Sequence, residues 1–223
     1  FVGGGNMAKG EALFEKVKKS FFGPFRVSVM LDSNGSNTTA AAGVALLAKA
    51  KSLTGKKALV LAGTGPVGMR AAGFLGMEGA DVTITSRTKE RAEEAAKVIE
   101  KRFGIKVKGA AGSNDEERAA AAKDANVIFA AGAIGVQLLP KSAWPDNPNV
   151  EMVADVNAQP PLGIEGIQAT DKGKDYNGKV AFGALGVGGL KLKLHRACIG
   201  KMFESADGMF DAEEIYALAK EMA

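Results

Sequence analysis

The sequence predicts an α/β protein, with a doubly wound parallel sheet and a second, smaller α/β domain. Strands and helices alternate from about residue 55 to residue 157. The expected strands are almost continuously apolar, which is typical of parallel strands covered by helices on both faces. A glycine-rich turn connects the first of these strands to a helix. The 223 residues are enough for one large domain or two small ones with a buried core.

The N-terminal part is expected to contribute a strand end, a helix and a second strand. Residues 1–5 (FVGGG) have the pattern of a strand that ends in a tight turn, a helix is expected over 9–20, and a strand over 25–30. Because the chain begins at such a strand end and without an initiator Met, we expect that a preceding segment is missing. A polar run over 31–39 then leads into an apolar helix over 40–51.

The middle and the tail of the chain are expected to supply the sheet and its covering helices. Strands are predicted at 57–61, 81–85, 105–107, 127–129, 152–154 and near 180–183, and helices at about 67–78, 89–103, 115–123 and 190–203. A last helix starts after Asp211, an N-cap with Glu214 three residues on, which matches a capping box. We expect this last helix to pack against the helix at 40–51.

The composition indicates an ordinary globular protein, with 46% hydrophobic and 24% charged residues. The net charge of +4 comes from Lys and Arg interleaved with Glu and Asp, which we interpret as solvated helix faces and not as a nucleic-acid surface. The mild positive excess suits an anionic ligand such as a phosphorylated cofactor. No stretch has the roughly 20 apolar residues of a membrane span, and no secretory signal opens the chain, so no membrane partner is expected.

Residues that often carry covalent or metal chemistry are scarce. The one cysteine, Cys198, excludes an intramolecular disulfide and fits a reducing cytoplasm, the predicted location; it is expected to be a packed thiol in a helix. The one histidine, His195, lies in the same helix beside Arg196, and a structural or surface role is favoured over catalysis. No Ser-His-Asp, paired-carboxylate or metal-ligand pattern is present, so no metal is expected.

The glycine-rich turn is the strongest functional signal. Gly63, Gly65 and Gly68 follow the strand at 57–61 and open a helix, and a second strand closes the unit about 20 residues on. In a dinucleotide-binding (Rossmann-type) unit the first glycine permits the tight turn, the second leaves room for the pyrophosphate, and the third lets the helix approach the sheet. The amides at the helix N-terminus then bind the phosphates. We therefore predict a dinucleotide site and not a merely structural turn.

The end of the second strand indicates which dinucleotide binds. NAD sites place Asp or Glu there to accept the ribose hydroxyls, but no acidic residue occurs from Val82 to Lys89. Ser86 can donate a hydrogen bond to a 2′-phosphate, and Arg87 can bind it with two donors. The alternative is that Arg87 is a solvated residue at a helix start. We predict NADP as the cofactor.

Two further turns at strand ends are expected to border the cofactor. Small residues over 130–135 follow one strand, and a polar turn over 155–161 follows the next, where Asn157 is a suitable partner for the nicotinamide amide. A purely structural role is the alternative for each turn. The residues predicted to bind the cofactor are Gly63, Thr64, Gly65, Pro66, Val67, Gly68, Ser86, Arg87, Ala131, Gly132 and Asn157.

Four segments taken together resemble one family. They are residues 32–42, 63–68, 157–163 and 183–191. On these motifs the chain resembles the NADP-dependent methylene-tetrahydromethanopterin dehydrogenase of methylotrophic bacteria, which also acts on methylene-tetrahydrofolate. The similarity covers the whole chain, and family members carry a further N-terminal stretch, in keeping with the expected missing segment.

The resemblance implies an arrangement of domains and a reaction. An NADP-binding domain over 52–180 would lie beside a domain formed by 1–51, and residues 181–223 would return to complete the cleft between them. The pterin would bind in that cleft, and its methylene group would be oxidised to methenyl with formation of NADPH. The resemblance also implies a homotrimer.

Lys191 matches the lysine to which the family's catalytic role is assigned. It follows glycines 186, 188 and 189, which allow a ligand to approach the backbone, whereas Lys193 is expected to be solvated. Loss of hydride gives an amidinium that two nitrogens stabilise, so the step needs alignment more than a strong acid or base. A protonated lysine would oppose this cation. Lys191 is therefore expected to be neutral through desolvation, or to direct its charge at the pterin's carbonyl.

The polar run before the apolar helix is the second candidate for contact with the substrate. A pterin presents coplanar amide and amino groups that short donors and acceptors can bind. The alternative is a capped loop with Asx turns, in which Asn37 or Thr38 is the N-cap of the helix at 40–51. The residues predicted to bind the substrate are Asp32, Asn34, Ser36, Asn37, Thr38 and Thr39.

Two other functions are alternatives. A different small substrate, for example a shikimate-like or aldehyde-type carbonyl compound, would need a proton donor such as a Lys–Asp or Tyr–Lys pair, and Asp32 with Lys191 could form one. A non-catalytic NADPH-sensing module would bind NADP without turnover. The polar run and the glycine–lysine segment argue against a sensor, because a sensor needs no second ligand pocket.

Overall fold

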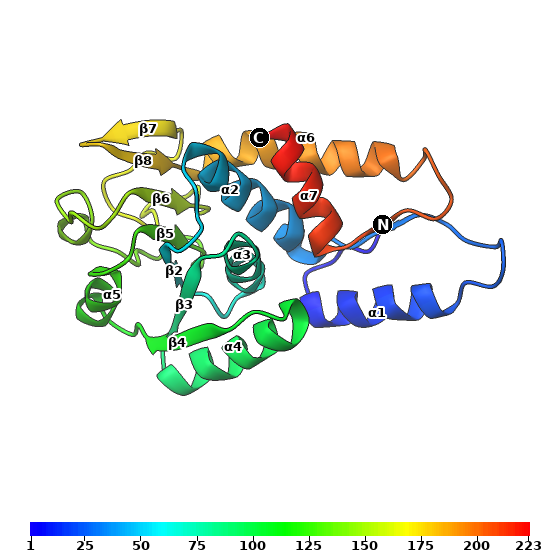
Figure 1. Cartoon of the computed structure of the whole chain (residues 1–223), viewed down its shortest axis with the longest axis horizontal. Helices are drawn as coiled ribbons and strands as arrows, with labels where there is room; N and C mark the ends of the chain where they lie inside the picture. The colour runs from blue at the N-terminus through cyan, green and yellow to red at the C-terminus, as the bar shows by residue number, and fades with distance from the viewer.

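A seven-stranded sheet dominates the computed structural model, which describes residues 1–223 (Figure 1). The strand order is β4-β3-β2-β5-β6-β8-β7, and neighbours are parallel except for β7, which is antiparallel to β8. The order reverses between β2 and β5, and sheets of this kind bind ligands at such a point, beyond the carboxyl ends of the strands. The strands are β2 (Lys57–Leu61), β3 (Asp81–Ser86), β4 (Val107–Ala111), β5 (Val127–Ala130), β6 (Met152–Asp155), β7 (Lys172–Tyr176) and β8 (Lys179–Phe182).

Helices and loops cover both faces of the sheet. Side chains alternate along each strand, so one strand can contribute to a core on each face. Val60 of β2 belongs to the larger core, whereas Leu59 and Leu61 belong to the smaller core on the opposite face. Five helices contribute to the larger core, and α5 with the segment around Trp144 contributes to the smaller one. The helices that cover the sheet are α2 (Ser36–Ala50), α3 (Pro66–Met77), α4 (Lys89–Phe103), α5 (Asp115–Ala122), α6 (Ala184–Lys201) and α7 (Ala212–Met222).

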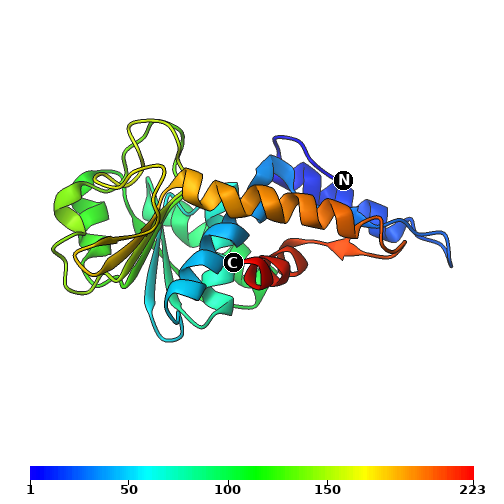
Figure 2. The same ribbon diagram turned by 90° about the horizontal axis from the view of Figure 1, so that it is seen from above.

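A smaller region projects from one end of the sheet (Figures 1 and 2). It contains α1 (Met7–Lys19) and two short parallel strands, β1 (Val29–Met30) and β9 (Met209–Phe210). Phe14 of α1 is buried here in a small core of its own, and Val2 bridges to the residue after β1. The long helix α6 extends from the sheet into this region, so it connects the two parts of the molecule (Figure 2).

The predicted fold class is confirmed, and so are several local expectations. The sheet is mostly parallel with helices on both faces. Asp211 and Glu214 form the expected capping box at the start of α7. Helix α7 packs against α2, as expected for the last helix and the apolar helix before the sheet. Cys198 is fully buried in the larger core, and burial raises the pKa of its thiol to about 11, which suits a packing role.

Two helices begin at least four residues earlier than the sequence predicts. Helix α2 starts at Ser36 with Gly35 as N-cap, so Asn37 and Thr38 lie inside its first turn and the prediction that one of them is the N-cap was wrong. Gly35 has φ +60°, a left-handed conformation that glycine adopts without strain. Helix α6 starts at Ala184 and not near residue 190. Its glycines belong to the helix, because tertiary packing outweighs their low helix propensity.

The strand boundaries also differ in places. The expected strand at 25–30 is reduced to β1, and the strand expected at 105–107 is β4, shifted to Val107–Ala111. Gly109 permits that shift, since a Cβ there would lie 2.5 Å from the backbone nitrogen of Glu93 in α4. Strands β7 and β9 were not predicted. The predicted domain boundary after residue 180 falls inside β8, and the division into domains stays a prediction.

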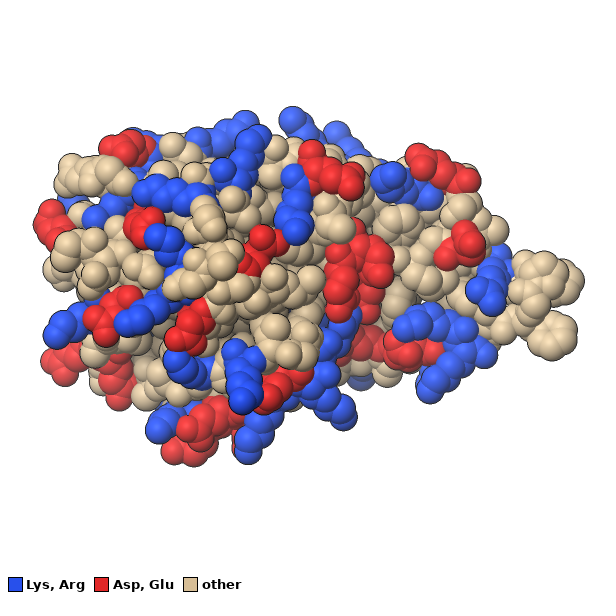
Figure 3. All heavy atoms as spheres, in the orientation of Figure 1, with Lys and Arg blue, Asp and Glu red and all other residues tan.

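The surface carries both signs of charge. Figure 3 shows Lys and Arg side chains interleaved with Asp and Glu over one face, as expected for solvated helix faces. No helix combines the length and the apolarity that crossing a bilayer requires. At the end of the projecting region, Phe22, Phe25 and Phe203 are more than three-quarters exposed, at 79%, 76% and 87%.

Candidate functional site

The glycine turn after β2 has the geometry of a phosphate-binding loop. A Cβ on Gly63 would lie 2.6 Å from Ile84 Cβ, and one on Gly68 would lie 2.7 Å from Gly63 Cα, so both glycines permit close packing of turn, helix and sheet. A Cβ on Gly65 would meet nothing closer than 3.8 Å, which leaves the space beside it open. Gly65 is the N-cap of α3 and supplies no side-chain acceptor. The amides of Val67 and Gly68 have no acceptor within the protein, so they are free for an anion.

A cavity of about 450 Å³ opens beside this turn, at the carboxyl ends of β2 to β5. Ser86 and Arg87 line it as predicted, and Thr64 Oγ1 lies 3.4 Å from Ser86 Oγ. None of the lining residues is acidic. One wall is apolar and includes Val136 and Leu138. A flat base could lie against that wall while a phosphate faces the cationic side, so the cavity fits the adenosine end of a dinucleotide with a 2′-phosphate.

Two further arginines line this cavity that sequence reasoning missed. Arg91 lies in the first turn of α4, four residues after Arg87, and this short separation in the sequence is the signal that could have revealed it. Arg118 of α5 donates to Gly112 O at 2.9 Å and to Asp115 Oδ1 at 2.5 Å, and its buried Nε has no partner. The cavity is therefore more cationic than the Ser86–Arg87 pair alone indicates.

The turn after β6 is held by its own side chains. Asp155 accepts hydrogen bonds from the backbone nitrogens of Asn157 at 2.9 Å and Ile164 at 3.0 Å. Burial raises the pKa of the Asp155 carboxyl, although these hydrogen bonds act in the opposite direction. The Asn157 amide donates to Pro161 O at 3.1 Å and accepts from Gln159 N at 3.1 Å. Asn157 thus shapes the turn at the end of β6 and is only 4% exposed.

The end of β5 brings the other predicted cofactor residues to the same edge. Ala131 donates its backbone N–H to Leu61 O of β2 at 3.1 Å, beside the glycine turn. Gly132 lines the cavity, and a Cβ there would lie 2.7 Å from Leu138 Cδ1. The ends of β2, β3 and β5 therefore bring together the predicted cofactor residues other than Asn157, which follows β6 and has its amide bonded within its own turn.

The predicted substrate residues fall into two groups. Asp32, Ser36, Asn37 and Thr38 are buried and bonded within the protein. Thr38, for example, donates to Asp32 from its backbone nitrogen at 3.1 Å and from Oγ1 at 2.7 Å. Asn34 is exposed and Thr39 is half-buried, so these two side chains are accessible to a ligand. The run is both a capped loop and an accessible polar edge.

Lys191 lies against this polar run. Its Nζ is 3.7 Å from the position that a Cβ on Gly35 would take, and Thr39 Oγ1 lies 3.9 Å from the same position. Lys191 is half-buried and forms no ion pair, whereas Lys193 is exposed as expected. A Cβ on Gly188, three residues before Lys191, would meet nothing within 4 Å. The structure thus brings the predicted catalytic lysine and the accessible part of the polar run together.

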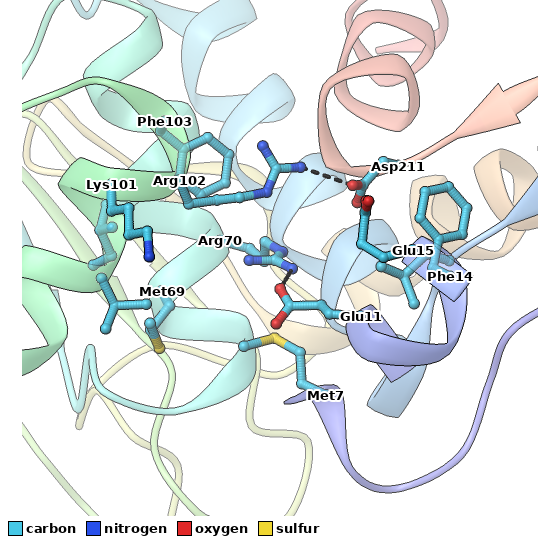
Figure 4. A pocket seen from close by; sticks show the side chains of 13 residues that line it. Met7, Glu11, Phe14, Glu15, Met69, Arg70, Lys101, Arg102, Phe103 and Asp211 are labelled. Carbon is cyan, nitrogen blue, oxygen red and sulfur yellow. Dashed lines mark hydrogen bonds and ion pairs between the residues drawn. The ribbon is translucent and has the colours of Figure 1, made fainter. Parts of the chain in front are cut away.

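A second cavity, of about 290 Å³, lies between α1, α3 and α4 (Figure 4). Its charged groups neutralise one another: the buried Arg70 pairs with Glu11, and Arg102 pairs with Asp211 at 2.8 Å. Both arginines lie over the ring of Phe103. None of the predicted site residues lines this cavity. Arg70 Nε also donates to Asn37 Oδ1 at 2.7 Å, so this cluster holds the polar run against α3.

Comparisons with known proteins place the chain among related sequences. A family model described as methylene-tetrahydromethanopterin dehydrogenase, N-terminal, matches residues 1–34. The chain is 66% identical over 225 residues to Bifunctional protein MdtA of Methylorubrum extorquens, covering 100% of this chain and 78% of that protein. It is 35% identical over 233 residues to the NAD(P)-dependent methylenetetrahydromethanopterin dehydrogenase of the same organism, again covering 100% of this chain and 78% of the relative.

Solved structures share the fold at much lower sequence identity. A transhydrogenase from Sinorhizobium meliloti is 18% identical with a TM-score of 0.54, covering 84% of this chain and 55% of that one. Shikimate 5-dehydrogenase from Listeria monocytogenes is 16% identical with a TM-score of 0.51, covering 82% and 62%. At these identities the similarity concerns the fold alone.

Proposed function

Since the chain belongs to the methylene-tetrahydromethanopterin dehydrogenase family, we propose that it transfers a hydride from the methylene group of methylene-tetrahydromethanopterin to NADP. The products are the methenyl form and NADPH. The observation that carries this function is the match over the whole chain to two relatives, one of them named for this activity. Methylene-tetrahydrofolate is the second proposed substrate.

The proposed cofactor contacts come from the ends of two neighbouring strands, β2 and β3. The open Gly65 and the free amides of Val67 and Gly68 would hold the pyrophosphate. Ser86 and Arg87 would hold the 2′-phosphate, and we add Arg91 because it lines the same cavity. The absence of acidic lining residues supports NADP over NAD, since a carboxylate would repel the 2′-phosphate.

The proposed substrate contacts are fewer than the sequence suggested. Asn34, Thr39 and Lys191 are accessible and would touch the pterin. Four side chains of the run already form hydrogen bonds within the protein, so we assign them to holding the loop in place: Asp32, Ser36, Asn37 and Thr38. This assignment combines the two interpretations of the polar run.

Hydride transfer requires that the protein align the pterin with the cofactor. NADP supplies the hydride acceptor when it is bound. Lys191 has no carboxylate partner, so its ammonium is free to donate to a carbonyl oxygen of the pterin and to orient the ring. Directed at that oxygen, its charge opposes the developing amidinium less than it would beside the reacting carbon.

We also propose a cytoplasmic homotrimer. The exposed Phe22, Phe25 and Phe203 of the projecting region support a contact between copies, since large exposed apolar side chains are candidates for burial at an interface. A mass measurement in solution tests the trimer. A strictly monomeric full-length protein would contradict it.

The experiment that tests the function is an assay of NADP reduction with methylene-tetrahydromethanopterin and methylene-tetrahydrofolate. We expect turnover with both, and no turnover with shikimate. Lys191→Ala should lower the single-turnover rate by about 100-fold if its hydrogen bond orients the ring, while Lys193→Ala, its exposed neighbour, should leave the rate unchanged. Tight NADP binding without turnover of either pterin would instead support the sensor.

A further inference from the structure

The buried carboxylate of Asp32 has one contact that capping of α2 does not explain. Its side chain is 1% exposed, and it accepts two hydrogen bonds from Thr38. Oδ2 also lies 3.3 Å from Nδ1 of His195, on the neighbouring helix α6. No Lys or Arg pairs with Asp32. A buried carboxylate needs donors, so the proton of the neutral imidazole is placed on Nδ1, where it faces Asp32.

This contact determines what the other ring nitrogen can do. With the proton on Nδ1, Nε2 of the neutral ring is a hydrogen-bond acceptor. Nε2 has no partner within the protein, and the His195 side chain is 32% exposed. The ring packs edge-on against Phe1, with centroids 5.5 Å apart. His195 is therefore held in orientation and keeps one accessible acceptor.

His195 lies beside the proposed substrate lysine. Residues 191 and 195 are four apart on α6, so their side chains lie on one face of the helix. Both touch the same turn: Lys191 lies against Gly35, and His195 contacts Asp32, whose carbonyl accepts from Gly35 N at 3.0 Å. Lys191 and His195 thus flank the same turn of the polar run.

We propose that His195 is a second substrate-contacting side chain, and that Asp32 is its positioning residue. Nε2 of His195 accepts a hydrogen bond from an N–H of the pterin ring, while Lys191 donates to the ring's carbonyl oxygen. A pterin carries amide N–H, amino and carbonyl groups on one ring edge, so a donor beside an acceptor matches it. This inference rests on the proposed function, and it revises the structural role expected for His195.

Two substitutions of His195 separate contact with the substrate from contact with Asp32. The amide of His195→Asn can replace the Nδ1 donor to Asp32 but has nothing at the Nε2 position. We expect it to raise the KM for methylene-tetrahydromethanopterin about 10-fold, the value of one hydrogen bond, and to leave the KM for NADP unchanged. His195→Gln places an amide nearer the Nε2 position and should restore part of the loss.

Matched controls and contrary outcomes are available on the same helix. Lys193→Gln and Arg196→Gln alter exposed neighbours of His195 and should change neither KM. A KM for the pterin within twofold of the wild-type value in His195→Asn would overturn the proposal. Wild-type protein without pterin turnover would instead contradict the proposed function, so the two failures are distinguishable.

The role of Asp32 has a spectroscopic test, because His195 is the one histidine of the chain. Imidazole ¹⁵N NMR of the neutral ring in the unmodified protein should show the Nδ1–H form. Addition of tetrahydrofolate, which cannot transfer hydride, should shift the Nε2 resonance. Asp32→Asn should convert the ring to the Nε2–H form and raise the pterin KM as much as His195→Asn. An Nε2–H form in the unmodified protein, or an Nε2 resonance that tetrahydrofolate leaves unchanged, would contradict the assignment.

Discussion

Two glycine-rich segments of this protein follow strands of the same sheet and lead into helices, yet only one can bind an anion through its helix N-terminus. The turn at 63–68 leaves the amides of Val67 and Gly68 without acceptors. At the start of α6, the amides of Leu185 and Gly186 already donate to Ala169 O, at 2.7 and 3.4 Å. The same local pattern therefore gives a phosphate site in one place and a closed helix end in the other.

The glycines of both segments have two structural roles. Some remove a clash: a Cβ on Gly183 or Gly186 would lie 2.0 Å from a backbone oxygen, and one on Gly68 would lie 2.7 Å from a backbone carbon. Others leave space, as Gly65 and Gly188 do. The number and spacing of the glycines do not distinguish these roles. The roles are distinguished by the atoms that a Cβ would meet at each position.

Gly186→Ala tests the packing role and should have the largest effect. The added methyl would lie 2.0 Å from the backbone oxygen of Asp171, so chain and helix must move apart. We expect the free energy of unfolding to fall by about 3 kcal/mol, as for severe overpacking, measured by denaturant titration. Unchanged stability would show that the start of α6 is not closed against the sheet.

Arg87→Ala tests whether the first segment serves NADP in particular. Loss of a charged donor to the 2′-phosphate should raise the KM for NADP by about 10- to 100-fold. The KM for NAD should change little, since NAD has no such phosphate. Lys89→Ala, an exposed neighbour paired with Glu93, is the matched control and should alter neither value. Equal effects of Arg87→Ala on both cofactors would contradict the assignment.

Gly65→Ala separates binding from folding in the first segment. A methyl there meets no protein atom within 3.4 Å, and φ is −80°, so stability should change by less than about 0.5 kcal/mol. The methyl would occupy the space beside the free amides, and NADP should bind about 10-fold more weakly in a titration. Normal affinity would place the pyrophosphate elsewhere.

Gly188→Ala is the corresponding test in the second segment and should have a small effect on folding, opposite in sign to that of Gly186→Ala. Replacing an interior helical glycine with nothing within 4 Å should stabilise the protein by about 0.5–1 kcal/mol. Gly200→Ala has equally open surroundings near the end of α6 and is the control. Both should raise the Tm, but only Gly188→Ala should raise the KM for the pterin. A KM that neither change affects would show that the pterin does not approach Gly188.

The parts of the fold that local pattern determines could be predicted from the sequence. The strand at 57–61 and the helix at 89–103 match the structure residue for residue, because apolar runs and turn residues bound them. The start of α6 could not be predicted, since three glycines in its first turns weaken the helix locally and packing of Val187 and Leu190 stabilises it. Strand β7 reads KGKDY and has no apolar alternation to reveal it.

The candidate site was predictable where its residues are adjacent in sequence. The glycine turn and Ser86–Arg87 belong to one strand–helix–strand unit, and the structure brings them to one cavity edge. The contact between Asp32 and His195 joins residues that are 163 positions apart, and no local sequence pattern predicts it. Arg70 is similar, since its partners Glu11 and Asn37 lie on two other helices.

Strand β7 has a consequence for how copies of this protein behave in a crowded solution. An exposed sheet edge offers unpaired N–H and C=O groups on which a strand of another molecule can add, and this addition starts aggregation. Here the last strand is short, exposed and irregular in register between Lys172 and Lys174. The two lysines lie on that edge and repel the same edge of a second molecule. This edge of the sheet is thus a poor template for a strand of another molecule.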